Sequence, residues 1–168
     1  MAAANTYVSI ATQTLGSTAA TIQFTSIPST YTDLVIVIQP KLTSGYGQMY
    51  LDFNGDTATN YSVTALSGNG SSASSARASN AGLANINNTI AVADTTLGDS
   101  IVIVNIMNYS NTTTYKTYLS RASNATNGSE ADVGLWRSTA AINSTKLYVG
   151  GTTFATGTVV SLYGILAA

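Results

Sequence analysis

Polar and apolar residues alternate with a period of two along much of this 168-residue chain. In residues 20–27, Ile22 and Phe24 alternate with threonine and glutamine side chains. A period of two is typical of a β-strand that turns one face toward a core and the other toward water. The pattern therefore predicts a half-buried strand at residues 20–27.

Residues 48–54 and 115–120 repeat this alternation. The side chains expected in the core are those of Met49, Leu51, Phe53, Tyr115, Thr117 and Leu119. Tyr50 and Tyr118 then lie on the opposite face, and Tyr148 does so in a later strand. Tyrosine offers a large contact area at a low entropic cost, which makes these three residues interface candidates. Strand propensity alone also favours tyrosine, and this alternative stays open.

Two segments, residues 33–39 and 100–107, are apolar on both faces. A closing strand expected at residues 158–166 shares this character. Strands of this kind are central strands covered on each side, or strands that become buried in an assembly. The sequence leaves both possibilities open.

Further strands are expected at residues 7–12, 60–66, 89–93, 132–137 and 146–150. Turn signals rich in Gly, Pro, Asn and Ser separate the strands. About ten short strands with this punctuation predict a single all-β domain over residues 1–168, built as an antiparallel β-sandwich. A jelly roll is the arrangement expected for that count. A short helix is expected near residues 81–87.

Residues 67–82 read SGNGSSASSARASNAG and contain no large apolar side chain. Such a segment cannot offset its ordering entropy by burial on its own, which predicts a long loop within the domain. The loop is either a mobile surface excursion or an arm that pairs with a neighbouring subunit. Arg77, its one charged residue, is an interface candidate.

The chain has no His and no Cys, and only six basic and seven acidic side chains. It lacks most groups that perform acid/base and thiol chemistry, so we expect a scaffold or binding surface without a cofactor rather than an enzyme. A net charge of −1 and scattered cations do not suit a nucleic-acid partner. Without a basic segment before an apolar stretch, or an apolar run near the roughly 20 residues of a membrane helix, we expect no secretory signal and no membrane partner.

Residues 52–57, DFNGDT, place oxygen-bearing side chains at Asp52, Asn54 and Asp56, as calcium-binding loops do. The glycine comes too early in the segment for such a loop, and no glutamate completes the cage. Asn54-Gly55 after an alternating strand also indicates a hairpin turn, because both central residues of a type I′ turn need positive φ. The hairpin is the favoured interpretation, and a calcium site is the alternative.

Two carboxylate pairs could in principle perform acid/base hydrolysis: Asp94 with Asp99, and Glu130 with Asp132. Both pairs are expected in connections between strands, where carboxylates are solvated. Serine catalysis lacks its usual base, since the chain has no His. Trp136 is expected to fill the core or an interface.

Several segments carry a family resemblance. Residues 51–62, LDFNGDTATNYS, resemble an LxFNGDxxxNYS stretch found in one group of tailed-bacteriophage virion proteins. Residues 154–165, FATGTVVSLYGI, resemble the ending F-x-x-G-[ST]-x-x-x-L-Y-G-I of the same group. Residues 108–111, 115–117 and 136–142 occur between them in the order seen in that group. The similarity covers most of the chain after about residue 20.

The resemblance implies a β-sandwich component of the virion exterior, assembled in the host cytoplasm. A capsid decoration, or cement, protein of the phage head is the expected role, and a tail or head-fibre module that binds a host receptor or glycan is the alternative. The expected partners are further copies of the chain, as a homotrimer, and the major capsid protein or other virion proteins. The resemblance brings no catalytic residues.

Overall fold

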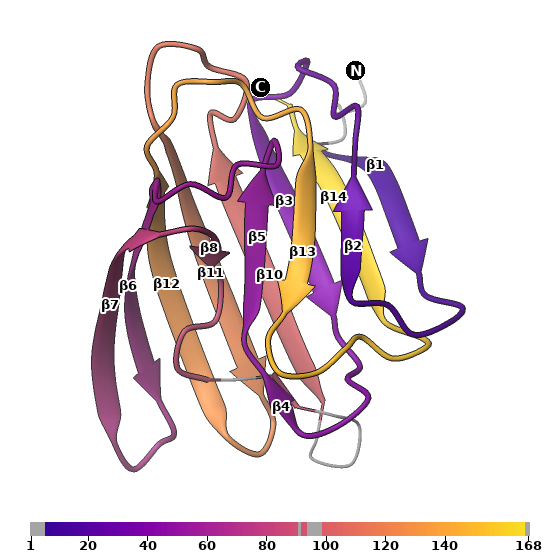
Figure 1. Cartoon of the computed structure of the whole chain (residues 1–168), viewed down its shortest axis with the longest axis vertical. Helices are drawn as coiled ribbons and strands as arrows, with labels where there is room; N and C mark the ends of the chain where they lie inside the picture. Colours follow the sequence, from indigo (N-terminus) through magenta and orange to yellow (C-terminus); the bar gives the residue numbers. More distant parts are fainter. Residues whose placement is uncertain (1–5, 91, 94–98, 167–168) are drawn as a thin grey trace.

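The computed structural model describes residues 6–90, 92–93 and 99–166, which form two packed layers of antiparallel strands (Figure 1). The large sheet has eight strands in the order β1 (Tyr7–Thr14), β14 (Val159–Ile165), β3 (Asp33–Gln39), β10 (Ser100–Met107), β11 (Lys116–Asn124), β12 (Gly128–Trp136), β6 (Tyr61–Gly68) and β7 (Ala73–Ala81). The small sheet has the order β2 (Thr21–Phe24), β13 (Thr145–Val149), β5 (Met49–Phe53) and β8 (Ala84–Asn85). A separate pair joins β4 (Tyr46–Gly47) to β9 (Val92–Ala93).

The predicted all-β sandwich is confirmed. Strands β3 and β10 have the bounds expected from their apolar runs, and β2, β5 and β14 lie within the segments predicted for them. The two sheets are unequal, with eight strands against four, and the jelly-roll arrangement stays a prediction. No helix in the described part of the chain is long and apolar enough to cross a membrane.

The core lies between the inner faces of the two sheets. Alternate residues of the central strands point into it and are almost completely buried: Leu34, Ile36 and Ile38 from β3, and Val102, Val104 and Ile106 from β10. The small sheet contributes the predicted residues Ile22, Phe24, Met49, Leu51 and Phe53. Trp136 is buried as well, and its ring stacks on Tyr61 with 6.2 Å between centroids.

The expected alternation of residues 115–120 is wrong, because Tyr118 and not Leu119 faces the core. Tyr118 is 1% exposed, and its hydroxyl donates a hydrogen bond of 2.9 Å to the backbone carbonyl of Asn85. Gly134 lies directly opposite on β12 and leaves room for the ring, since a Cβ there would come within 1.9 Å of it. Tyr118 is therefore a core residue and not an interface residue of the folded chain.

Residues 67–82, expected as a long loop, instead contain the end of β6, a tight turn and β7. The turn is closed by Asn69, whose side-chain oxygen accepts hydrogen bonds from the backbone of Ser71 and Ser72. β7 pairs with β6 along its length and forms one edge of the large sheet. The backbone hydrogen bonds to β6 order this segment, although its small side chains show no apolar alternation.

Residues 81–87 form no helix. They contain β8 and a loop in which Asn side chains bind the backbone: Asn85 Oδ1 accepts a hydrogen bond from the backbone N–H of Asn87, and Asn87 Oδ1 accepts one from that of Met49. Such side-chain bonds compete with helical ones, which is why asparagine disfavours helix interiors. β8 is held at the edge of the small sheet by pairing with β5.

Candidate functional site

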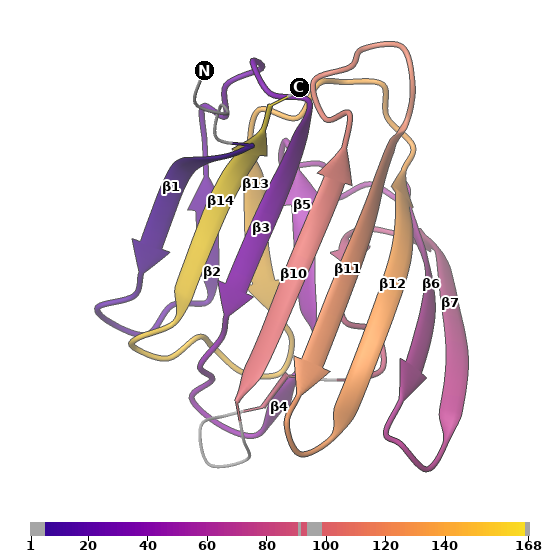
Figure 2. The same cartoon turned by 180° about the vertical axis from the view of Figure 1, so that it is seen from behind.

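The side of the large sheet that faces away from the small sheet is called the outer face here. Figure 2 looks straight onto it and shows the strands of the large sheet in front, with no described strand of the small sheet covering them. The core covers the inner face of β3 and β10. Of their outward residues, Ile101 is exposed, Val37, Ile103 and Asn105 are half-buried, and Val35 is buried at 4% exposure. The sandwich itself thus covers one face of these strands fully and the other face in part, and both explanations for their apolar character stay open.

The outer face is rich in apolar side chains, and the strand register arranges them in rows. One row runs Leu66, Ala131, Arg121, Ile103 and Val37 across β6, β12, β11, β10 and β3. The neighbouring row runs Arg77, Thr64, Val133, Leu119, Asn105 and Val35. Leu66 is 63% exposed and Val133 58%, and the two lie in adjacent rows on neighbouring strands. The exposed apolar side chains in these rows make the outer face the candidate contact surface of the described residues.

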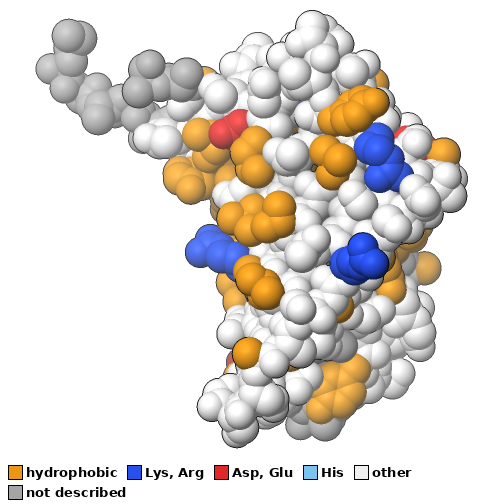
Figure 3. Space-filling view, turned by 90° about the vertical axis from the view of Figure 1, so that its left-hand side faces the viewer, with side chains coloured by type: hydrophobic (Ala, Val, Ile, Leu, Met, Phe, Trp, Pro, Cys, Tyr) orange, Lys and Arg blue, Asp and Glu red, His pale blue; other side chains and the backbone are white. Residues whose placement is uncertain are grey.

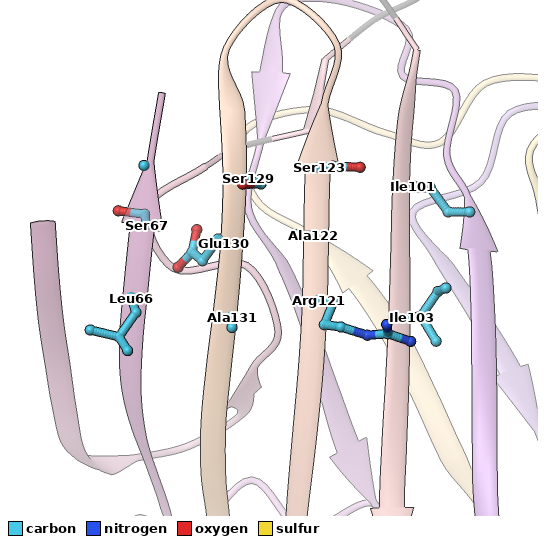
Figure 4. Close-up of a pocket in the computed structure, with 11 residues that line it drawn as sticks. Leu66, Ser67, Ile101, Ile103, Arg121, Ala122, Ser123, Ser129, Glu130 and Ala131 are labelled. Atoms are coloured by element: carbon cyan, nitrogen blue, oxygen red, sulfur yellow. The ribbon is translucent and has the colours of Figure 1, made fainter. Parts of the chain in front are cut away.

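A hollow of about 540 Å³ lies within the outer face. Its apolar walls come from Leu66, Ile101 and Ile103, and Figure 4 shows the Arg121 side chain extending across the sheet toward Ile103. Arg121 forms no ion pair within the described residues, where the one ion pair joins Lys146 and Asp52 at 4.0 Å. The hollow thus combines a lining of aliphatic and serine side chains with an arginine that forms no ion pair within the described residues.

Charges on the outer face are few. Arg121 and Arg77 are both exposed and lie on it, three strands apart and in neighbouring rows. Asp33 lies on this face within β3, where it accepts a 2.6 Å hydrogen bond from the backbone of Asn108, and the exposed Asp99 stands directly before β10 in the alternation of Ile101 and Ile103. Arg77, an interface candidate, therefore lies on the same surface as Arg121.

The edge of the large sheet formed by β7 is polar. Figure 3 views the molecule from this side and shows few blue or red side chains, with separate hydrophobic patches among the white surface. A surface with few charges loses little hydration energy when a partner covers it.

Glu130 and Asp132 are buried inside the sandwich, so the expectation of solvated carboxylates is wrong. β12 begins earlier than expected, at Gly128, and its alternation turns both side chains inward. Glu130 accepts hydrogen bonds of 2.8 Å from the backbone N–H of Thr89 and another from that of Ile90. The two carboxyl groups hold the loop after β8 against the large sheet.

The environment of Asp132 favours its protonated form. Burial raises its pKa most, and the adjacent Glu130 raises it further through a hydrogen bond and its negative charge, to about 8. The Oδ1 atom of Asp132 is buried without a donor partner, and protonation supplies a donor for the bond between the two carboxyl groups. The other pair cannot be compared, because Asp94 lies outside the described residues.

The three calcium candidates use their oxygens within the protein. Asp52 accepts hydrogen bonds from the Gly55 backbone and from the Tyr148 hydroxyl, the latter at 2.6 Å. Asn54 Oδ1 accepts hydrogen bonds from two backbone N–H groups of the connection before β13. Asp56 accepts hydrogen bonds from Asn60, Trp136 and the Ala58 backbone. The described residues contain no group of three acidic side chains placed to hold a metal.

Asn54 and Gly55 have φ of 58° and 71°, as the predicted turn requires, but they do not close a hairpin. The turn carries the chain from β5 in the small sheet to β6 in the large sheet, so its flanking strands are not paired. The sequence specifies the turn locally, whereas the pairing of strands depends on the whole core.

Tyr50 and Tyr148 are half-buried on the outward side of the small sheet, where they lie opposite each other on β5 and β13. The Tyr50 hydroxyl donates to Gln48 at 2.8 Å, and Tyr148 donates to Asp52. The structure thus keeps both residues near the surface but away from Arg77. The candidate residues that the sequence did not single out are Leu66, Ile101, Ile103, Arg121 and Val133; the apolar character of both faces of β10 is the signal that points to them.

Comparison with models of known protein families finds no match for the chain, and comparison with curated proteins finds no relative. The functional conclusion therefore rests on the physical character of the surface.

Proposed function

We propose that this chain is a non-enzymatic structural protein of a tailed-phage virion, a decoration protein that stabilises the head by adhering to other virion proteins through its outer face. The observation that supports this most is the exposed apolar surface of the large sheet. A side chain such as Val133 gains about 25 cal/mol for each Å² of apolar area that a partner covers. The phage assignment comes from the resemblance of residues 51–62 and 154–165.

The surface suits adhesion because covering it removes few charges from water. Leu66, Val133 and Ile101 contribute apolar area, and the serine and threonine side chains between them can pair with a partner or hold bridging water. Each contact can be weak, since repetition over many copies on a shell adds avidity. Covering β7 would also protect the free backbone groups of that edge strand.

The chemistry inside the sandwich supports a structural role. Glu130 and Asp132, the carboxylate pair of β12, are occupied by backbone hydrogen bonds and by each other. The hollow on the outer face offers Arg121 and no paired acid and base on its surface. A hydrolytic mechanism needs two carboxyl groups that reach a substrate together.

The copy number and position of the chain in purified phage particles test this proposal. Quantitative mass spectrometry should find many copies per particle, and cryo-electron microscopy should place them on the outside of the head with the outer face covered. A handful of copies at the tail would replace decoration by the fibre role. Absence of the chain from the particle would remove both.

A further inference from the structure

We propose that the turn between β6 and β7 is a self-modifying site, at which Asn69 converts to aspartate and isoaspartate with water as the only co-reactant. The chain contains three Asn-Gly pairs, at residues 54–55, 69–70 and 127–128. A glycine after asparagine favours this reaction, because a backbone nitrogen without a neighbouring Cβ approaches the asparagine side chain freely. The surroundings of the three pairs differ, and they favour conversion at Asn69.

The reaction begins when the backbone nitrogen of Gly70 attacks Cγ of Asn69 and gives up its proton. A bond forms between these two atoms, the bond from Cγ to Nδ2 breaks, and ammonia leaves, so that a cyclic imide remains. Water then opens the imide, either at Cγ to give aspartate or at the main-chain carbonyl carbon to give isoaspartate. One amide and one water thus become one carboxylic acid and one ammonia, without oxidation or reduction.

The turn places hydrogen-bond donors where this reaction develops negative charge. Oδ1 of Asn69 accepts hydrogen bonds from the backbone N–H of Ser71 at 3.0 Å, from that of Ser72 at 2.9 Å and from the Ser72 hydroxyl at 3.2 Å. When the Gly70 nitrogen attacks Cγ, negative charge passes to Oδ1. Donors already aimed at that oxygen stabilise the tetrahedral intermediate, as an oxyanion hole does in an enzyme.

The attacking and leaving groups of this turn are unrestrained. Asn69 and Gly70 are both exposed, and neither the Asn69 Nδ2 nor the Gly70 N–H forms a hydrogen bond within the described residues. Gly70 has a φ of 87°, and no neighbouring heavy atom lies within 4 Å of where its Cβ would be. The Gly70 peptide unit therefore has space to rotate toward the side chain, and water reaches the imide.

Asn54, which also precedes a glycine, is restrained in the folded chain. The N–H of Gly55 donates a 3.2 Å hydrogen bond to Asp52, so the attacking nitrogen is already bound. Nδ2 of Asn54, the leaving group, donates a 2.8 Å hydrogen bond to the Ala141 carbonyl. Conversion of Asn54 has to break both bonds first, and we expect it to be slow.

Two further asparagines meet only part of the requirements. Asn127 precedes Gly128, but Gly128 is the first residue of β12, and a Cβ there would collide with the backbone of the neighbouring β6–β7 turn. Asn111 accepts hydrogen bonds from the groups two and three residues ahead, as Asn69 does, but the β-branched Thr112 follows it and hinders attack. Of the three Asn-Gly pairs, the one at Asn69 combines free reacting groups with donors at the amide oxygen.

Conversion alters the edge of the large sheet. The product carries one more negative charge, on a chain whose net charge is −1. The isoaspartyl form also adds a carbon to the main chain and removes the amide oxygen that binds Ser71 and Ser72, which loosens the turn. The reaction needs no partner, so it is independent of the proposed function.

Peptide mapping by tandem mass spectrometry, on folded protein incubated at mildly alkaline pH, tests this inference. Asn69 should convert at least tenfold faster than Asn54 and Asn111, and faster than Asn127. In urea the three Asn-Gly pairs should convert at similar rates, because the unfolded chain has neither the donors nor the restraints. Equal rates at the three pairs in folded protein, or the same order in folded and unfolded protein, would overturn the inference.

Ser72→Ala removes one donor to the Asn69 amide and leaves the reacting atoms unchanged. It should slow conversion of Asn69 at least threefold in folded protein and leave the rate in urea unchanged. Ser71→Ala is the matched control, because Ser71 binds Asn69 through its backbone N–H and keeps that bond, and it should change the rate by less than half. The same rate in both variants would show that the donors do not activate the amide and would contradict the proposal.

Discussion

At the scale of single residues, the pair formed by Tyr118 and Gly134 determines how the large sheet meets the small one. The Tyr118 ring occupies the space that a side chain at position 134 would fill, and its hydroxyl reaches the backbone of β8. A glycine on a central strand is otherwise unfavourable, because it packs nothing and gains entropy when the chain unfolds. Its place here follows from the close approach of the ring.

Gly134→Ala should therefore be strongly destabilising for a change of one methyl group. The new Cβ would lie 1.9 Å from the Tyr118 ring and force the ring or the strand to move. We expect the free energy of unfolding in urea to fall by about 3 kcal/mol. Gly16→Ala is the matched control, since no heavy atom lies within 4 Å of its added Cβ, and it should change stability by less than about 0.5 kcal/mol. Equal losses for both variants would contradict the packing described here.

Asp132 should make stability depend on pH. Its pKa of about 8 in the folded protein lies above the value of about 4 expected in the unfolded chain. Between these values the folded state holds a proton that the unfolded state lacks, so the free energy of unfolding falls as pH rises from about 4 to about 8, by at most about 1.4 kcal/mol per pH unit.

Asp132→Asn keeps the shape of the side chain and cannot ionise, so it should flatten this slope. Urea unfolding at pH 5 and pH 8 measures it, and Asp99→Asn, at an exposed position, should retain the wild-type slope. A slope unaffected by Asp132→Asn would show that this carboxyl group is not held protonated.

At the scale of elements, the strands with the clearest patterns were predictable and those governed by distant partners were not. β3 and β10 could be predicted from their continuous apolar runs, because a central strand needs apolar residues whichever strands pair with it. β7 is ordered by its ladder with β6, and no local pattern shows this. The inward direction of residue 118 depends on Gly134 in another strand, so reading either strand alone cannot settle it.

The turn after β5 should bind calcium weakly or not at all. The oxygens of Asp52, Asn54 and Asp56 already accept hydrogen bonds from the backbone, from Tyr148 and from Trp136. A calcium ion would have to break these bonds before it gained its own ligands. Millimolar Ca²⁺ should leave the thermal midpoint unchanged and give no saturable heat by calorimetry. A saturable heat that Asp52→Asn removes would contradict this expectation.

At the scale of the whole molecule, the two sheets have different outward surfaces. The small sheet turns Tyr50 and Tyr148 outward, each with its hydroxyl hydrogen-bonded, whereas the large sheet turns outward a broad apolar surface that carries two arginines. A protein that remained alone in water would gain nothing from exposing Leu66 and Val133 to this extent. The asymmetry gives the sandwich one side suited to a partner.

Much of the architecture could thus be predicted from the alternation of residues, whereas the candidate surface could be predicted only in outline. The apolar character of both faces of residues 33–39 and 100–107 raised the possibility of an assembly. The position of Arg121 among aliphatic side chains depends on the register of four strands, and register is a property of the folded sheet.

The most direct test of the central claim places a charge on the outer face and measures attachment to phage particles. Val133→Glu changes a side chain that is 58% exposed, so the fold should persist, as a thermal midpoint close to that of the wild type would verify. Thr21→Glu, on the outward side of the small sheet, is the matched control. The account predicts that Val133→Glu reduces the copies bound per particle at least tenfold, or about 1.4 kcal/mol, while Thr21→Glu leaves them unchanged. Unchanged attachment of a folded Val133→Glu protein would contradict it.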